Sequence, residues 1–120
     1  MPLHQRDFIL RLIEEAGAAV ARLRVRLGLG GPAEMETLVR DAETAQEALF
    51  GQLWPSVRLL DARSAVMLIG DTRRVAAWAE LLRIQADAHR RAGAPEQADR
   101  LTSRADALQL EAERRNGATG

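Results

Sequence analysis

The stretch from Ala86 to Ala98 constrains the fold more than any other part of the sequence, because it contains the end of one helix and the start of another. Gly93 can adopt the positive φ that closes a helix. Pro95 suits the first turn of the next helix, where a backbone N–H is not needed. Small side chains, including Ala105, stand where two antiparallel helices would touch. The stretch therefore predicts a helical hairpin.

The composition favours an all-α protein with a single core. The chain has 120 residues, of which 47% are apolar and 28% charged, as is usual for one globular domain. Aromatic residues make up only 3% and tyrosine is absent, whereas β-rich domains and domains that stack on nucleic-acid bases need more of them. Alanine, leucine, arginine and glutamate, all strong helix formers, dominate instead. We expect one domain over residues 1–120, a compact all-α bundle of about five helices.

Hydrophobic periodicity places these helices along the chain. Apolar residues recur three and four positions apart, which is the spacing of one buried helix face. Pro55 disfavours helical geometry at Trp54, so we expect extended backbone there and a break near residues 54–56. Residues 28–32 should form a flexible connector and residues 116–120 a frayed tail. The predicted helices cover residues 6–27, 33–53, 57–69, 72–92 and 95–115.

The predicted helix over residues 72–92 differs from the others, because apolar side chains occupy two nearly opposite sides of it. Val75 and Trp78 lie on one of these sides, and Ile84 and Ala88 on the other. A helix that is apolar on two sides is usually packed on two sides. We therefore place this helix at the centre of the bundle, with Trp78 in the core.

Charge and residue usage exclude several classes of function. All 17 basic residues are arginine and 17 acidic residues balance them, so no long-range field attracts nucleic acid or an anionic membrane. The absence of cysteine excludes disulfides, thiolate metal sites and thiol catalysis. His4, in the expected disordered start, and His89 belong to no metal-binding pattern. We predict a non-enzymatic protein without a catalytic, cofactor or metal site, and a structural role for His89.

Residues 79–110 resemble one unit of the tetratricopeptide repeat family. The small-residue positions of that family fall on Ala86, Ala98 and Ala105, and its turn glycine falls on Gly93. A solenoid needs about three units to stand alone, so the resemblance implies a repeat-like hairpin that closes a compact bundle. Because such hairpins serve elsewhere as docking surfaces, the resemblance also implies a protein partner.

The segment from Asp7 to Glu14, with the sequence DFILRLIE, is similar to the opening of a family of small bacterial proteins of unknown function. Members of that family begin with the pattern Asp-aromatic-Ile-x-Arg-x-Ile-Glu, and they end in a similar helical hairpin. This resemblance supports a helical fold and implies no activity.

The leading functional hypothesis is a protein–protein interaction or assembly module, whose partner is either another protein or a second copy of the chain. The polar sector of the 72–92 helix, with Arg83, Asp87 and Arg90, is expected to border a groove that receives the partner. Trp54, at the predicted bend, is a further candidate anchor, because exposed tryptophans often dominate binding.

Two alternatives remain open from the sequence. Arg22, Arg24 and Arg26, at the end of the first predicted helix, could contact a membrane surface or a nucleic acid in a peripheral accessory protein. A small ligand could instead bind in a pocket near His89 and Trp78. No apolar run approaches the length of a membrane span, and the N-terminal segment is acidic and amphipathic rather than uniformly apolar. We therefore expect a cytoplasmic protein.

Overall fold

The structure is a computed structural model that describes residues 3–119, with the side chains of residues 6–117. Within these residues the chain forms α-helices and short 3-10 turns and no β-strand, which confirms the predicted all-α class. The helices are α1 (Leu3–Leu29), α2 (Met35–Phe50), α3 (Trp54–Val57), α4 (Ala62–Ile69), α5 (Thr72–Arg91) and α6 (Pro95–Thr119). The 3-10 turns are η1 (Pro32–Glu34) and η2 (Gly51–Leu53).

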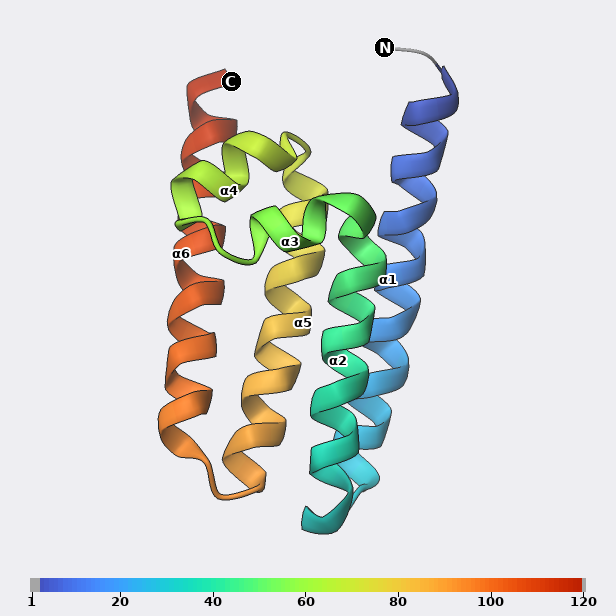
Figure 1. Ribbon diagram of the computed structural model, residues 1–120, viewed down its shortest axis with the longest axis vertical. Coiled ribbons are helices and arrows are strands. Elements are labelled where there is room, and N and C mark those ends of the chain that lie inside the picture. The colour runs from blue at the N-terminus through green and yellow to red at the C-terminus, as the bar shows by residue number, and fades with distance from the viewer. Residues whose placement is uncertain (1–2, 120) are drawn as a thin grey trace.

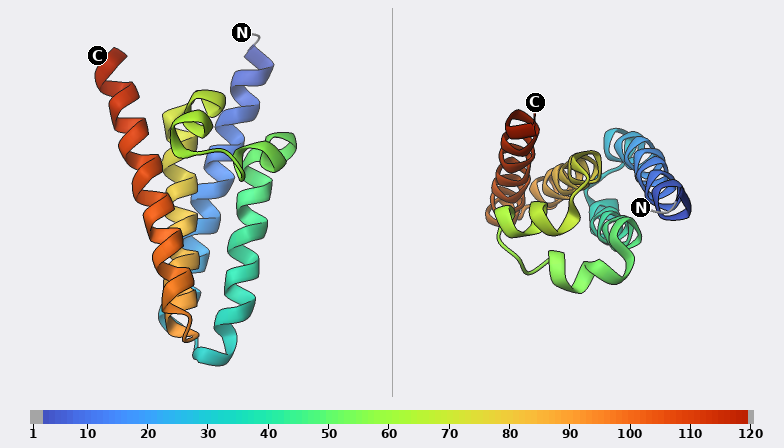
Figure 2. Two further views of the ribbon diagram at one scale, coloured as in Figure 1. Left: turned by 60° about the vertical axis from the view of Figure 1, so that its left-hand side comes forward. Right: turned by 90° about the horizontal axis from the view of Figure 1, so that it is seen from above.

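The four long helices α1, α2, α5 and α6 run along the long axis of a bundle that measures 45 × 26 × 25 Å (Figure 1). Helix α5 packs against α1, α2, α4 and α6, which confirms its predicted central position. The short helices α3 and α4 cross one end of the bundle between α2 and α6 (Figure 2). Helices α1 and α6 lie on different sides of α5, and α2 and α6 both pack against α5 (Figure 2).

The core is built around both apolar sides of α5. Val75 is 0% exposed and Ile84 is 2% exposed, although their nine-residue separation places them about 180° apart around the helix. Both sides of α5 are therefore covered by neighbouring helices, as expected for a helix that is apolar on two sides. The largest fully buried side chains are Trp78, Phe50, Met35, Leu38, Leu49, Leu81, Leu108, Val57 and Val75.

The turn between α5 and α6 has the predicted form. Gly93 has a φ of 85°, and the N–H of Ala94 donates a hydrogen bond of 2.8 Å to the carbonyl of His89, which closes the helix end. Helix α6 then begins at Pro95. The small residues of the seam, Ala86, Ala98 and Ala105, are all buried between the two helices. An antiparallel hairpin is therefore present, whereas its likeness to the tetratricopeptide repeat stays a prediction.

Two boundaries around the short helices differ from the prediction. Helix α2 ends at Phe50 rather than at residue 53, because Gly51 takes a φ of 55° that other residues rarely adopt. Trp54 is helical, with φ −56° and ψ −47°, so the extended backbone and the break predicted at residues 54–56 are wrong. Pro55 lies in the first turn of α3, where the absent N–H would have had no helical partner.

The predicted helix over residues 57–69 is also wrong in its first part. Helix α3 ends at Val57, and α4 begins only at Ala62, because Asp61 caps it. The Asp61 carboxylate accepts a hydrogen bond of 2.9 Å from the backbone N–H of Ser64. A carboxylate at this position satisfies one of the free N–H groups at a helix start, so the cap fixes the boundary.

The ends of the outer helices extend beyond their predicted limits. Helix α1 begins at Leu3, so the disordered start expected around His4 is wrong for the backbone, and the His4 side chain lies outside the described side chains. Helix α1 continues through Leu29, which shortens the predicted connector. Helix α6 continues to Thr119, so the frayed tail predicted for residues 116–120 is wrong for residues 116–119, and residue 120 lies outside the described part.

Candidate partner-binding pocket

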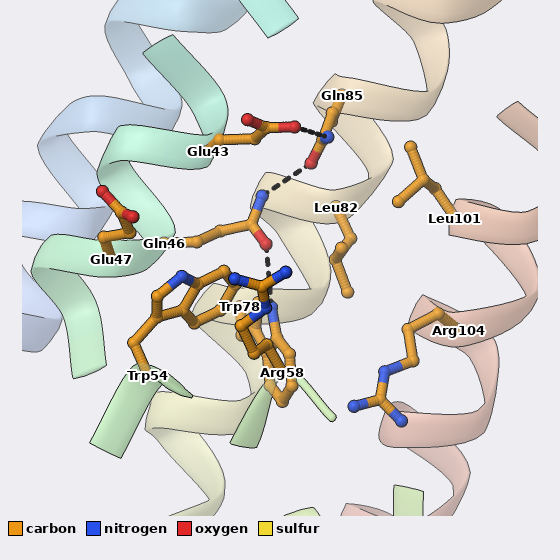
Figure 3. A pocket seen from close by; sticks show the side chains of 10 residues that line it. All are labelled: Glu43, Gln46, Glu47, Trp54, Arg58, Trp78, Leu82, Gln85, Leu101 and Arg104. Atoms are coloured by element: carbon orange, nitrogen blue, oxygen red, sulfur yellow. Dashed lines mark hydrogen bonds between the residues drawn. The ribbon is translucent and has the colours of Figure 1, made fainter. Parts of the chain in front are cut away.

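A chain of buried amide hydrogen bonds connects α2 with α5. The indole N–H of Trp78 donates to Gln46 Oε1 at 3.0 Å, and Gln46 Nε2 donates to Gln85 Oε1 at 2.7 Å. Gln85 Nε2 then donates to the carboxylate of Glu43 at 3.0 Å (Figure 3). Gln46 is 2% exposed and Gln85 is 6% exposed. Because unpaired polar groups are unfavourable inside a protein, these bonds hold the side chains in fixed positions.

A cavity of about 300 Å³ opens beside these amides, and we call it the docking pocket. Helix α5 supplies its floor, α2 one wall and α6 the opposite wall, while α3 and the segment after it close one end (Figure 3). The docking pocket is lined by Glu43, Gln46, Glu47, Trp54, Arg58, Trp78, Leu82, Gln85, Leu101 and Arg104.

Both tryptophans of the chain line this pocket. Their ring centroids are 6.1 Å apart with an interplanar angle of 75°, and Phe50 packs against both rings. Trp54 is half-buried and Trp78 is fully buried. Edge-to-face and offset aromatic contacts of this kind add to the packing energy of the core. The pocket therefore has a rigid aromatic end.

Arg104 stands over this aromatic end from the α6 side. Its guanidinium carbon lies 5.1 Å from the ring centroid of Trp78, and its Nη2 donates to the carbonyl of Val57 at 3.0 Å. Desolvation by burial lowers the pKa of Arg104, and the charge of Asp61 opposes that shift. Within the described residues no carboxylate forms an ion pair with Arg104 or with the exposed Arg58.

The opposite wall of the docking pocket carries the other sign of charge. Glu43 and Glu47 are one helical turn apart on α2 and are both exposed. Glu43 accepts the hydrogen bond from Gln85, so its carboxylate is directed toward the pocket (Figure 3). The pocket is therefore acidic on the α2 side and basic on the side of α3 and α6.

The polar sector predicted to bind a partner has a role within the chain. Arg83 Nη2 lies 2.7 Å from Asp106 of α6 and also donates to Gln109. Arg90 pairs with Asp87 at 3.2 Å and with Asp99 of α6 at 3.3 Å. These contacts join α5 to α6 along one edge of the hairpin.

That edge lies away from the docking pocket. Arg104 and Asp106 are two positions apart on α6, and two positions correspond to about 200° around a helix. Arg104 lines the pocket, whereas Asp106 pairs with Arg83 on the other edge. Of the four predicted partner-binding residues, the structure brings only Trp54 to the pocket, and the role of the other three stays a prediction.

The residues of the membrane or nucleic-acid alternative and of the small-ligand alternative lie in different parts of the structure. Arg24 pairs with Glu80 at 3.3 Å and Arg26 pairs with Asp41 at 2.7 Å, so two of the three arginines near the end of α1 have carboxylate partners. Arg22 is exposed on the same helix. For the small-ligand alternative, Trp78 does line a cavity, whereas the half-buried His89 is not among the residues that line it.

Several important residues were not singled out from the sequence. Gln46 stands on the apolar face of α2, four residues after the buried Ala42, and this interruption is a signal of a buried polar contact. Arg74 is 6% exposed, donates to the carbonyl of Leu49 at 2.8 Å and stacks over Phe50. Its sequence context gives no comparable signal, because the carbonyl it binds belongs to another helix.

Comparisons with models of known protein families, with curated proteins and with solved structures found no match to this chain. Given their length and hydropathy, none of the helices within residues 3–119 could serve as a bilayer-spanning segment. In the same part of the chain, no group of three or more His, Asp or Glu side chains could hold a metal ion.

Proposed function

We propose that this protein is a non-enzymatic interaction module that holds a segment of a partner protein in the docking pocket. The main support is the presence of two tryptophans and an arginine without an ion pair around one open cavity. Tryptophan and arginine are the residues that most often dominate the energy of protein interfaces. The buried amides beneath them keep this surface rigid, which limits the entropy that binding would remove.

The lining of the docking pocket supports a binding role rather than catalysis. It contains no hydroxyl, thiol or imidazole group among the described residues, so the usual nucleophiles and the usual neutral-pH base are missing from it. Its ionisable groups are Glu43, Glu47, Arg58 and Arg104. Such charged groups around an aromatic floor suit recognition of a polar partner.

The position of the pocket favours a peptide segment as the occupant. Helices α2 and α6 both pack on α5 and form walls on either side of it. A groove between helices is a common site for an extended or helical segment of another protein. The second class of partner in this proposal is a second copy of the chain, and light scattering at several concentrations tests it by the measured mass.

Site-specific crosslinking tests the proposed docking site. Glu47, on the exposed rim of the pocket, is replaced by the photoreactive residue benzoylphenylalanine, and the exposed Glu113 of α6 is replaced in the same way as a control. We expect a discrete protein adduct from position 47 in cells that make the protein, and none of that mass from position 113. Equal adducts from both positions, or none from position 47, would contradict the proposal.

The proposal also has a cellular setting. We propose that the protein is cytoplasmic, and that it is bacterial, in keeping with the resemblance of residues 7–14 to small bacterial proteins. We also propose that the α5–α6 hairpin is of the tetratricopeptide type. Fractionation of cells that make the protein tests the location, because the chain should remain with the cytoplasmic fraction at both low and high salt.

A further inference from the structure

The guanidinium groups of Arg58 and Arg104 line the docking pocket and form no ion pair within the described residues. A guanidinium has five N–H donors, and the carbonyl of Val57 is the one hydrogen-bond acceptor that Arg104 has within the described residues. Contact with the Trp78 ring and with this carbonyl holds the Arg104 side chain in place. Its remaining N–H groups are therefore available to an acceptor that comes from outside the chain.

The apolar part of the pocket lies beside these cations. Leu82 belongs to the α5 floor and Leu101 to the α6 wall, and the half-buried ring of Trp54 lies at the end closed by α3 (Figure 3). An apolar side chain that covered these residues would remove water from around Arg104. Because electrostatic attraction is stronger where water is excluded, this would strengthen the pairing of Arg104 with an anion.

From this arrangement we infer that the docking pocket selects a partner segment with an acidic side chain next to an apolar one, and that Arg104 binds its carboxylate while the charge of Arg58 adds to the attraction. The inference rests on the proposed docking function and adds the chemistry of the partner. Arginine matches a carboxylate through paired N–H···O bonds, which gives geometric specificity as well as attraction.

The acidic wall sets the direction of the bound segment. Glu43 and Glu47 lie across the pocket from Arg104, on α2 (Figure 3). A second acidic residue of the partner would be repelled there, whereas a basic residue would be attracted. The chain has a formal net charge of zero, so this selection depends on local charges rather than on the field of the whole protein. We therefore expect the segment to carry its acidic residue toward α6 and a basic residue toward α2.

Selection from a random-peptide library displayed on phage tests the inference. The immobilised wild-type protein should enrich peptides with Asp or Glu adjacent to a large apolar residue. Binding of a selected peptide is then measured by the fluorescence of Trp54 and Trp78, which are the only tryptophans and both line the pocket. Replacing the peptide's acidic residue by its amide, or Arg58→Gln in the protein, should weaken binding by roughly tenfold or more.

Two further variants complete this test. Arg104→Gln should weaken binding at least as much as Arg58→Gln. Because Arg58 is exposed, Arg58→Gln should leave the fold intact, so it keeps the test valid even if Arg104→Gln does not fold. Arg40→Gln, at an exposed position of α2 outside the pocket, should leave binding unchanged. Selected peptides without an acidic preference, or with equal affinity for Arg58→Gln, would overturn the inference and leave the docking function standing. A selection that enriches no peptide would overturn both.

Discussion

At the scale of single residues, this fold depends on buried polar groups that have partners and on small residues at close helix crossings. Gln46 accepts from Trp78 and donates to Gln85, so one side chain satisfies polar groups of two others. Loss of such a residue leaves its partners buried without hydrogen bonds, which is more unfavourable than loss of a single exposed bond.

Replacement of Gln46 by methionine tests this dependence. The two side chains have similar length, but methionine cannot bond the Trp78 indole or the Gln85 amide. We expect Gln46→Met to lower the free energy of unfolding by about 1–3 kcal/mol, measured by chemical denaturation. Gln97→Met, at an exposed position of α6, should change it very little. Equal stability of the two variants would show that the amide chain does not contribute.

The close crossing of α5 and α6 gives a second prediction at this scale. Ala98 is 0% exposed in the seam between the two helices. Ala98→Leu should lower the free energy of unfolding by about 1–3 kcal/mol, because a tightly packed site does not accommodate the larger side chain. Ala76→Leu, at an exposed position of α5, is the matched control. Coincident denaturation midpoints for the two variants would rule out this crossing.

Sequence periodicity identified the apolar residues better than the polar ones. The burial of Trp78, Ala98 and Ala105 follows from their spacing along one helix. The burial of Gln85 depends instead on a donor and an acceptor that α2 supplies, and that of Arg74 on a backbone acceptor of α2. Such pairings require the arrangement of whole helices, which local spacing does not contain.

At the scale of elements, the limits of the helices are set by a few residues at their ends. Gly93 and Pro95 placed the α5–α6 turn from the sequence alone, because glycine tolerates the positive φ that closes a helix and proline suits the first turn of the next helix. The prediction of extended backbone at Trp54 was wrong, because a proline disfavours helical geometry in the residue before it but also suits the first turn of a helix. Gly51 ends α2 before Pro55 is reached, so Pro55 lies in the first turn of a new helix.

Two glycine substitutions test the helix ends against the helix interior. Gly93 has a positive φ and an added Cβ would meet no atom within 4 Å, so Gly93→Ala should destabilise through backbone strain alone, by roughly 1–2 kcal/mol. Gly17 lies within α1 with equally open space around it. Gly17→Ala should stabilise the protein by roughly 0.5–1 kcal/mol. Thermal or chemical denaturation measures both, and shifts of the same sign would contradict this account.

The cap of α5 predicts a dependence of stability on pH. Asp71 accepts from the backbone N–H of Arg73 at 2.9 Å, and the hydrogen bond and charge of the Arg73 side chain lower the pKa of Asp71 below its usual value of 3.8. A lowered pKa stabilises the fold above pH 3.8, and this stabilisation is lost as the pH falls through the pKa of the folded state. Asp71→Asn keeps a capping oxygen and should reduce this dependence, measured as unfolding at neutral and acidic pH. An unchanged pH profile would contradict the assignment.

At the scale of the whole molecule, the docking pocket is a product of assembly. Its lining residues come from α2, α5 and α6, from α3 and from the segment that follows α3, and no two of these elements alone enclose it. The sequence identified Trp54 and Trp78 as notable but could not bring them together with Arg104, since that requires the position of α6 relative to α2. The all-α class needed only helical periodicity and composition, and was therefore predictable.

The most direct test of the central claim is an NMR spectrum of the isotopically labelled protein with a peptide selected on it. The two indole N–H signals belong to Trp54 and Trp78, both in the docking pocket. The account predicts that the peptide shifts the Trp54 indole signal and the backbone signals of Glu47 and Arg104. An unchanged indole signal, with shifts confined to the edge that carries Arg83 and Arg90, would contradict it.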